Sequence, residues 1–133
     1  MMSKSYHGVK DGQLADCPNS PNCVSTQTKS PDKQMKPLPF NGELAETKML
    51  IRNILEDMER TSIEMETDTY IHAVVTTKLL KFKDDVEFYL DEESNLVHYR
   101  SASRVGYSDF GVNRKRMEQI SEEFKRRLKE DTP

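Results

Sequence analysis

Residues 84–116 read DDVEFYLDEESNLVHYRSASRVGYSDFGVNRKR, and the other predicted elements are arranged around this segment. It begins with acidic residues, passes through a polar tip at 92–95, and returns into a segment rich in arginine, serine and glycine. A four-residue loop at the tip predicts a β-hairpin with the pairs Leu90–Val97, Phe88–Tyr99, Val86–Ser101, Glu87–Arg100 and Tyr89–His98. One face is then mainly apolar and the other charged, and a slip of one residue would bury polar or charged side chains.

The residues before the hairpin predict one helix and two strands. Apolar side chains recur at helical spacing over residues 41–60, and Asn41 is the expected N-cap. Residues 61–67 and 70–77 carry the alternation and the β-branched side chains that are typical of strands. We expect a tight turn at 68–69 to join them.

A second helix is predicted after the hairpin, over residues 113–130. Its apolar stripe consists of Met117, Ile120, Phe124 and Leu128. We expect Asn113 to cap this helix and Val112 to pack on Met117 as a hydrophobic staple. The order helix, four strands, helix predicts an α+β fold, a four-stranded antiparallel sheet with two helices packed on one face.

Length and composition limit the classes of protein to consider. A chain of 133 residues fits one domain, and we expect a flexible segment at 1–16 and a single α+β domain at 17–133. The formal net charge of -3 argues against a nucleic-acid partner. No run of about 18 apolar residues is present, and residues 1–17 lack the apolar core of a secretion signal. We therefore predict a soluble cytoplasmic protein that does not associate with a membrane.

Three motifs together resemble a known family. They are CPNSPNC followed by VST at 17–26, DDVEF at 84–88, and RSASRVGYSDFGVNRKR at 100–116. In this order they resemble the domain-of-unknown-function family numbered 1499, and the resemblance extends from Cys17 to the last helix. It implies a single small domain. It implies no activity, because the family is named for having no assigned function.

The basic segment around the last helix is the leading candidate for a binding site. The residues that would bind an anion are Arg100, Ser101, Ser103, Arg104, Asn113, Arg114 and Arg116. Arginine at a helix start suits an anion, because free backbone N–H groups there add to the positive charge. The other interpretation is an internal network in which these cations pair with the supporting carboxylates Asp84, Asp85, Glu87 and Asp109. The two interpretations are compatible, since a structural network can also border a pocket.

Cys17 and Cys23 form the second candidate. Their C-x5-C spacing is neither the C-x-x-C redox motif nor a usual zinc half-site. A disulfide, a redox-sensitive pair and two structural thiols all remain open. His72 and His98 could complete a metal set with the cysteines only if the fold brought all four together. We therefore predict no metal site and no cofactor.

The function predicted from these features is a non-enzymatic binding or interaction module. Its partner is unknown, with an anionic small molecule and an acidic protein surface as the two candidates. The alternative is a thiol-dependent or redox-responsive enzyme that uses the Cys17/Cys23 loop. A serine hydrolase is disfavoured, because His98 and Ser101 fall on opposite faces of one strand.

Overall fold

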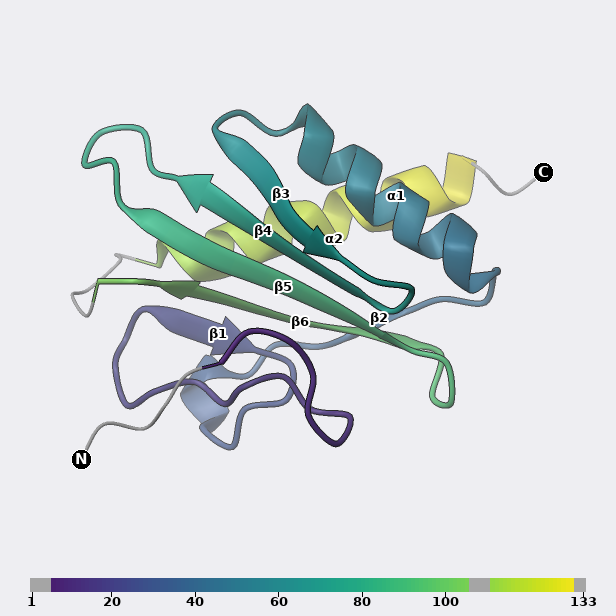
Figure 1. The fold of residues 1–133 in the computed structure, drawn as a ribbon, viewed down its shortest axis with the longest axis horizontal. Coiled ribbons are helices and arrows are strands. Elements are labelled where there is room, and N and C mark those ends of the chain that lie inside the picture. Colours follow the sequence, from purple (N-terminus) through teal and green to yellow (C-terminus); the bar gives the residue numbers. More distant parts are fainter. Residues whose placement is uncertain (1–5, 106–110, 131–133) are drawn as a thin grey trace.

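The computed structural model describes residues 6–105 and 111–130. Its elements, in chain order, are β1 (Cys23–Ser25), the short 3₁₀ helix η1 (Pro31–Lys33), β2 (Leu38–Pro39), α1 (Leu44–Asp57), β3 (Thr61–Glu66), β4 (Tyr70–Thr76), β5 (Lys83–Asp91), β6 (Leu96–Ser103) and α2 (Val112–Glu130). The predicted α+β class is confirmed, with two α-helices and a sheet of antiparallel strand pairs (Figure 1).

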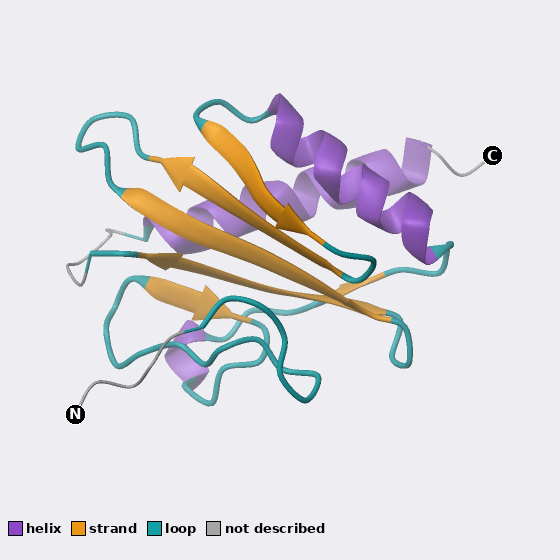
Figure 2. Cartoon of the chain, viewed as in Figure 1, coloured by secondary structure: helices purple, strands orange, loops and turns teal. Residues whose placement is uncertain are grey.

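Within the part of the chain that the structure describes, the sheet has six strands, so the prediction of four was wrong. The strand order is β1-β6-β5-β4-β3, and β2 also pairs with β6. No strand was predicted before α1, but β1 and β2 add to the outer edge of β6 (Figure 2). Their pairing covers an edge that would otherwise expose free N–H and C=O groups, and it buries Val24 and Leu38 in the core.

The central hairpin has the predicted register. β5 and β6 pair Leu90 with Val97, Phe88 with Tyr99, Val86 with Ser101, Glu87 with Arg100 and Tyr89 with His98. The loop between them spans the predicted residues 92–95. This register places Val86, Phe88 and Leu90 in the hydrophobic core under the helices.

Helix α1 is shorter than the predicted 41–60, and its predicted cap was wrong. Glu43 is the N-cap residue and makes no side-chain cap hydrogen bond. Instead, the Glu43 carbonyl accepts hydrogen bonds from the backbone N–H and the side-chain hydroxyl of Thr47. The buried face of α1 is formed by Thr47, Leu50, Ile51, Ile54 and Leu55.

Helix α2 begins one residue before the predicted start. The predictions that Asn113 caps the helix and that Val112 precedes it as part of a hydrophobic staple were therefore wrong. Asn113 lies inside the helix and is 1% exposed, and its side chain bonds to groups outside the helix. Val112 is therefore helical itself and remains partly exposed. The predicted apolar stripe is confirmed, because Met117, Ile120 and Phe124 are buried in the core and Leu128 packs against it.

Both faces of the central strands are covered. The two helices and the apolar core lie on one face, with α2 passing behind the strands in Figure 1. On the other face, the backbone N–H of Gly8 donates to the Glu87 carboxylate, and Leu14 and Ala15 are buried. The helix face and the N-terminal face are the names used below for these two sides. Among residues 6–105 and 111–130, neither helix has the length and apolar character needed to cross a membrane.

Candidate functional site

The charged residues of the central hairpin lie on both faces of the sheet. Successive side chains of a strand point to opposite sides. Asp84 therefore lies on the helix face, whereas Asp85 lies on the N-terminal face with Arg100 and Arg104. The residues predicted as one anion site, apart from Arg114, consequently form two clusters with the sheet between them. Asp109, the fourth supporting carboxylate, lies outside the described residues.

Asp84 and Arg116 form the centre of the cluster on the helix face. The Arg116 Nη2 donates to Asp84 Oδ2 at 2.7 Å, and both side chains are almost fully buried. The Arg116 Nη1 donates to Ser101 Oγ and to Asn113 Oδ1. No acidic residue occupies the first turn of α2, so Asp84 supplies the negative charge that offsets a cation at the positive end of the helix dipole.

Asn113 ties this cluster to neighbouring segments. Its amide nitrogen donates to the Asn22 carbonyl at 3.1 Å and to Ser103 Oγ at 3.1 Å. Its amide oxygen accepts from Ser101 Oγ at 2.6 Å. Ser101, Ser103, Asn113 and Arg116 are thus brought together as the sequence suggested, but around a carboxylate of the protein itself.

Glu87 and Arg100 are paired on the N-terminal face, as the hairpin register predicted. Their closest atoms, Oε2 and Nη1, are 3.5 Å apart, and Glu87 is 0% exposed. The other Glu87 oxygen accepts from the Tyr70 hydroxyl at 2.6 Å and from the Gly8 N–H. Burial, and then this hydrogen bond to Glu87, raise the pKa of the Tyr70 phenol. Tyr70 therefore remains a neutral donor at any physiological pH.

Asp85 is the centre of a second group on the same face. Arg104 donates to both of its carboxylate oxygens at 3.0 Å. His72 Nε2 lies 2.8 Å from Asp85 Oδ1, and His7 Nε2 lies 3.4 Å from Oδ2. Burial alone would raise the pKa of Asp85, but the hydrogen bonds to His72 and Arg104 outweigh it and hold that pKa below its ordinary value.

Arg114 and Lys115 complete the basic segment at the start of α2. Arg114 Nη2 donates to the Asp32 carbonyl at 2.8 Å, so this guanidinium contacts the η1 segment. Lys115 is exposed and lines a groove at the start of α2.

That groove, called here the α2 groove, is a large concave feature of the described residues beside the start of α2. It lies between the end of α1, the β4–β5 connection and the first turns of α2, and has a volume of about 750 Å³. Its apolar wall is formed by Met58, Val75, Leu79, Leu80, Phe82 and Val112. Its charged lining consists of Arg60, Lys78, Lys115 and Arg116 with Glu59 and Asp84. This volume lies within the range of small-molecule sites.

Two properties of the α2 groove point to a ligand. Leu79 is 87% exposed and Leu80 is 67% exposed, so adjacent large apolar side chains face solvent at its rim. Asp84, which lines the groove, has one carboxylate oxygen, Oδ1, that is buried without a hydrogen-bond partner among the described residues. A buried unpaired acceptor is uncommon, because it has lost its hydration without replacement.

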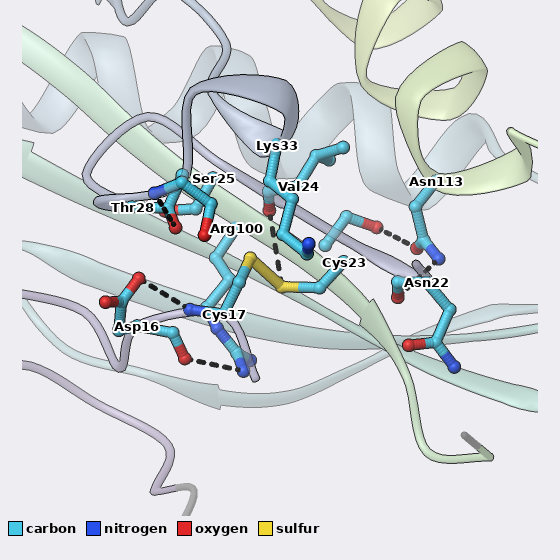
Figure 3. Close-up of a disulfide and its surroundings, with 12 residues drawn as sticks. Asp16, Cys17, Asn22, Cys23, Val24, Ser25, Thr28, Lys33, Arg100 and Asn113 are labelled. Atoms are coloured by element: carbon cyan, nitrogen blue, oxygen red, sulfur yellow. Dashed lines mark hydrogen bonds between the residues drawn. A yellow bond between two sulfur atoms is a disulfide. The ribbon is translucent and has the colours of Figure 1, made fainter. Parts of the chain in front are cut away.

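The cysteine loop forms a disulfide beside the Glu87–Arg100 pair. Cys17 and Cys23 are bonded, with their Cα atoms 5.7 Å apart. Figure 3 shows the Arg100 side chain next to this bond, and Arg100 Nη2 donates to the Asp16 carbonyl. Cys23 lies in β1 and is 1% exposed.

The metal set considered from the sequence does not form, because both cysteines are in the disulfide. His98 bonds to Thr26 instead, with Nδ1 and Oγ1 2.9 Å apart.

Sequence reasoning missed several residues that the fold brings into these clusters. Leu79 and Leu80 lie between the predicted strand at 70–77 and the hairpin and were assigned no role, although two adjacent leucines between charged lysines were a visible signal. His7 and Tyr70 carried no signal, because their importance depends on where the N-terminal segment crosses β4 and β5. Asn22 was part of a recognised motif whose role only the tertiary contacts reveal.

The comparisons identify the family but no activity. The model of the family described as "Protein of unknown function (DUF1499)" matches residues 13–124, so the chain belongs to this family. This confirms the resemblance read from the three motifs. The chain matches none of the curated proteins.

Proposed function

We propose that this member of the family of unknown function 1499 is a binding module for an anionic amphipathic small molecule, held in the α2 groove. The observation that carries the proposal is the buried Asp84–Arg116 pair at an apolar groove, where Asp84 Oδ1 has no hydrogen-bond partner within residues 6–105 and 111–130. Apolar walls and a few polar groups at one end are typical of small-molecule sites.

The net charge of the groove lining favours a ligand with a negative charge. Four cationic side chains and two carboxylates line it, so the lining has an excess of positive charge. Lys115 is exposed there and is available to a ligand carboxylate or phosphate. Within the predicted anion site, only Ser103 and Arg116 line this groove, so the proposal narrows that site and adds Lys115 and the leucines.

Asp84 determines which polar group the head of the amphipathic ligand should carry. Asp84 Oδ1 is buried and accepts hydrogen bonds only, so the ligand should carry a hydroxyl or amide donor near its negative charge that reaches this oxygen when the groove closes on it. An acidic protein surface, the other partner predicted from the sequence, would contact the exposed lysines but leave the buried acceptor of Asp84 unpaired. The groove therefore favours the small molecule.

The proposal is tested by calorimetric titration with 3-hydroxydodecanoate below its micelle concentration. We expect one molecule bound per chain, and roughly tenfold weaker binding of dodecanoate, because a hydrogen bond to a charged group is worth about 1.5–3 kcal/mol. Dodecyltrimethylammonium, which has the same tail and the opposite charge, should not bind at this site. Equal affinity for the anionic and cationic amphiphiles would reject the proposal.

Matched variants locate the site. Lys115→Glu should weaken binding roughly tenfold, whereas Lys125→Glu, with the same charge change on the same helix but outside the groove, should not. Leu80→Ser should also weaken binding, and Met65→Ser, at another exposed apolar residue, serves as its control. All four positions are exposed, so folding should be unaffected.

A redox-responsive disulfide is the second candidate, because Cys17 and Cys23 are bonded in the structure. Its test is differential alkylation of the protein in cells from which it is purified, before and after an oxidant. A change in the bonded fraction would support a redox role, and a constant fraction would leave the disulfide structural. The same measurement bears on the predicted cytoplasmic location, since reducing compartments disfavour permanent disulfides.

A further inference from the structure

The N-terminal face carries a cluster of metal-binding side chains that lies apart from the α2 groove. His7 comes from the N-terminal segment, His72 from β4 and Asp85 from β5. One ligand atom from each lies within 4.8 Å of the others. This is the arrangement expected of three groups that surround one ion.

The sheet fixes two of these side chains. His72 pairs with Glu87 and Asp85 with Val74, so His72 and Asp85 are diagonal neighbours on adjacent antiparallel strands. Their closest atoms are 2.8 Å apart, and their side chains are 10% and 8% exposed. Two buried ligands are therefore positioned before any ion binds.

His7 closes the cluster from the solvent side. Its side chain is 43% exposed and stacks on His72, with ring centroids 4.3 Å apart and an interplanar angle of 27°. An ion can therefore enter past His7 without disturbing the sheet. The next backbone amide, Gly8 N–H, is held by Glu87, which keeps His7 close to its partners.

We propose that His7, His72 and Asp85 bind a divalent transition-metal ion of the zinc class. Two imidazole nitrogens and one carboxylate oxygen are ligands that zinc accepts, and three protein ligands leave a coordination position open. On binding, the proton that His72 Nε2 shares with Asp85 is released or moves to Nδ1, and Nε2 then gives its lone pair to the ion.

Arg104 can stay in contact with Asp85 when an ion is bound. A carboxylate offers about four lone-pair positions, so Asp85 can accept from Arg104 and still ligate metal. Arg104 then acts as an outer partner that orients the carboxylate, as such partners do in metal sites. The bound metal would link the N-terminal segment to the sheet, because His7 belongs to that segment and the other two ligands belong to the sheet.

The test is a Zn²⁺ titration of the chelator-treated full chain with its disulfide intact, so that no thiol competes. We expect one ion per chain for the wild type and at least a roughly tenfold loss of affinity in His7→Asn, a change at an exposed position. His98→Asn removes the remaining histidine and should bind Zn²⁺ as the wild type does.

A second readout separates a built site from weak surface binding. Saturating Zn²⁺ should raise the thermal midpoint of the wild type and leave that of His7→Asn unchanged, because only the native cluster binds the ion. Equal affinity in the wild type and His7→Asn, or an equal loss in His98→Asn, would overturn the proposal. So would a wild type that binds no Zn²⁺ at the concentrations tested.

Discussion

At the scale of single residues, the most unusual feature of the chain is that charged side chains are buried on both faces of the β5–β6 hairpin. Asp84 and Arg116 pair under α2, and Glu87 and Arg100 pair on the opposite face. Removing one partner of such a pair leaves a charge in a site that water does not reach. These residues should therefore matter far more for stability than the exposed ion pairs of the helices.

Glu87→Gln tests this difference. It leaves the Arg100 guanidinium, 3% exposed, without its counter-charge, and we expect the free energy of unfolding to fall by about 3 kcal/mol in chemical denaturation. Glu123→Gln is the control, because Glu123 pairs with Arg126 and Arg127 at the surface, where solvent screens the charges, and its loss should cost far less stability. Similar losses in the two variants would contradict a special role for the buried pair.

His98 should make stability depend on pH. Burial lowers its pKa, although Asp91 acts in the opposite direction, so the unfolded chain binds a proton more readily than the folded one. The stability that neutral His98 contributes is present at high pH and is lost as pH falls below about 6.5. The free energy of unfolding of the wild type and of His98→Gln, measured by chemical denaturation from pH 8 to 5, gives this contribution.

The wild type should lose more stability over that range than His98→Gln does. The remaining histidines, His7 and His72, and all carboxylates are common to both proteins, so the difference isolates His98. Parallel pH profiles for the two proteins would show that His98 is not responsible.

At the scale of elements, local patterns predicted the hairpin and the helix faces but not the helix starts or the added strands. The hairpin register followed from the alternation of apolar and polar side chains, because a shift of one residue in the strand pairing would have buried charged side chains. Asn113 looked like a cap, but its side chain bonds to Ser101 and Asn22, which are distant in sequence. β1 and β2 form because β6 offers them an edge, and no local pattern encodes that pairing.

The disulfide should stabilise the segment that carries β1. A bridge across a separation of six residues contributes about 2.4 kcal/mol by the chain-entropy relation. The double variant Cys17→Ser/Cys23→Ser should lose about that amount in equilibrium denaturation. The reduced wild type should match it, because both lack the same constraint. A reduced wild type that keeps its full stability would contradict this account.

At the scale of the whole molecule, the central strands separate two candidate sites. The helix face carries the α2 groove beside Asp84 and Arg116, and the N-terminal face carries His7, His72 and Asp85. The anion site predicted from the sequence combines residues that lie on both faces of the sheet. Sequence reasoning could not separate them fully, because the position of the N-terminal segment and the start of α2 depend on tertiary contacts.

The two sites should act independently. Lys115→Glu should weaken amphiphile binding and leave Zn²⁺ affinity unchanged, while His7→Asn should do the reverse. Calorimetry of both variants with both probes measures this. Loss of both activities in either variant would indicate a general effect on folding.

The most direct test of the central claim is a methyl NMR titration with 3-hydroxydodecanoate. Leu79, Leu80 and Val112 lie on the groove wall, and Leu14 lies on the N-terminal side of the sheet as an internal reference. We expect saturable shifts of the groove methyls at one molecule per chain, with the Leu14 methyls unchanged. Absence of shifts at Leu79, Leu80 and Val112, or shifts of equal size at Leu14, would contradict it.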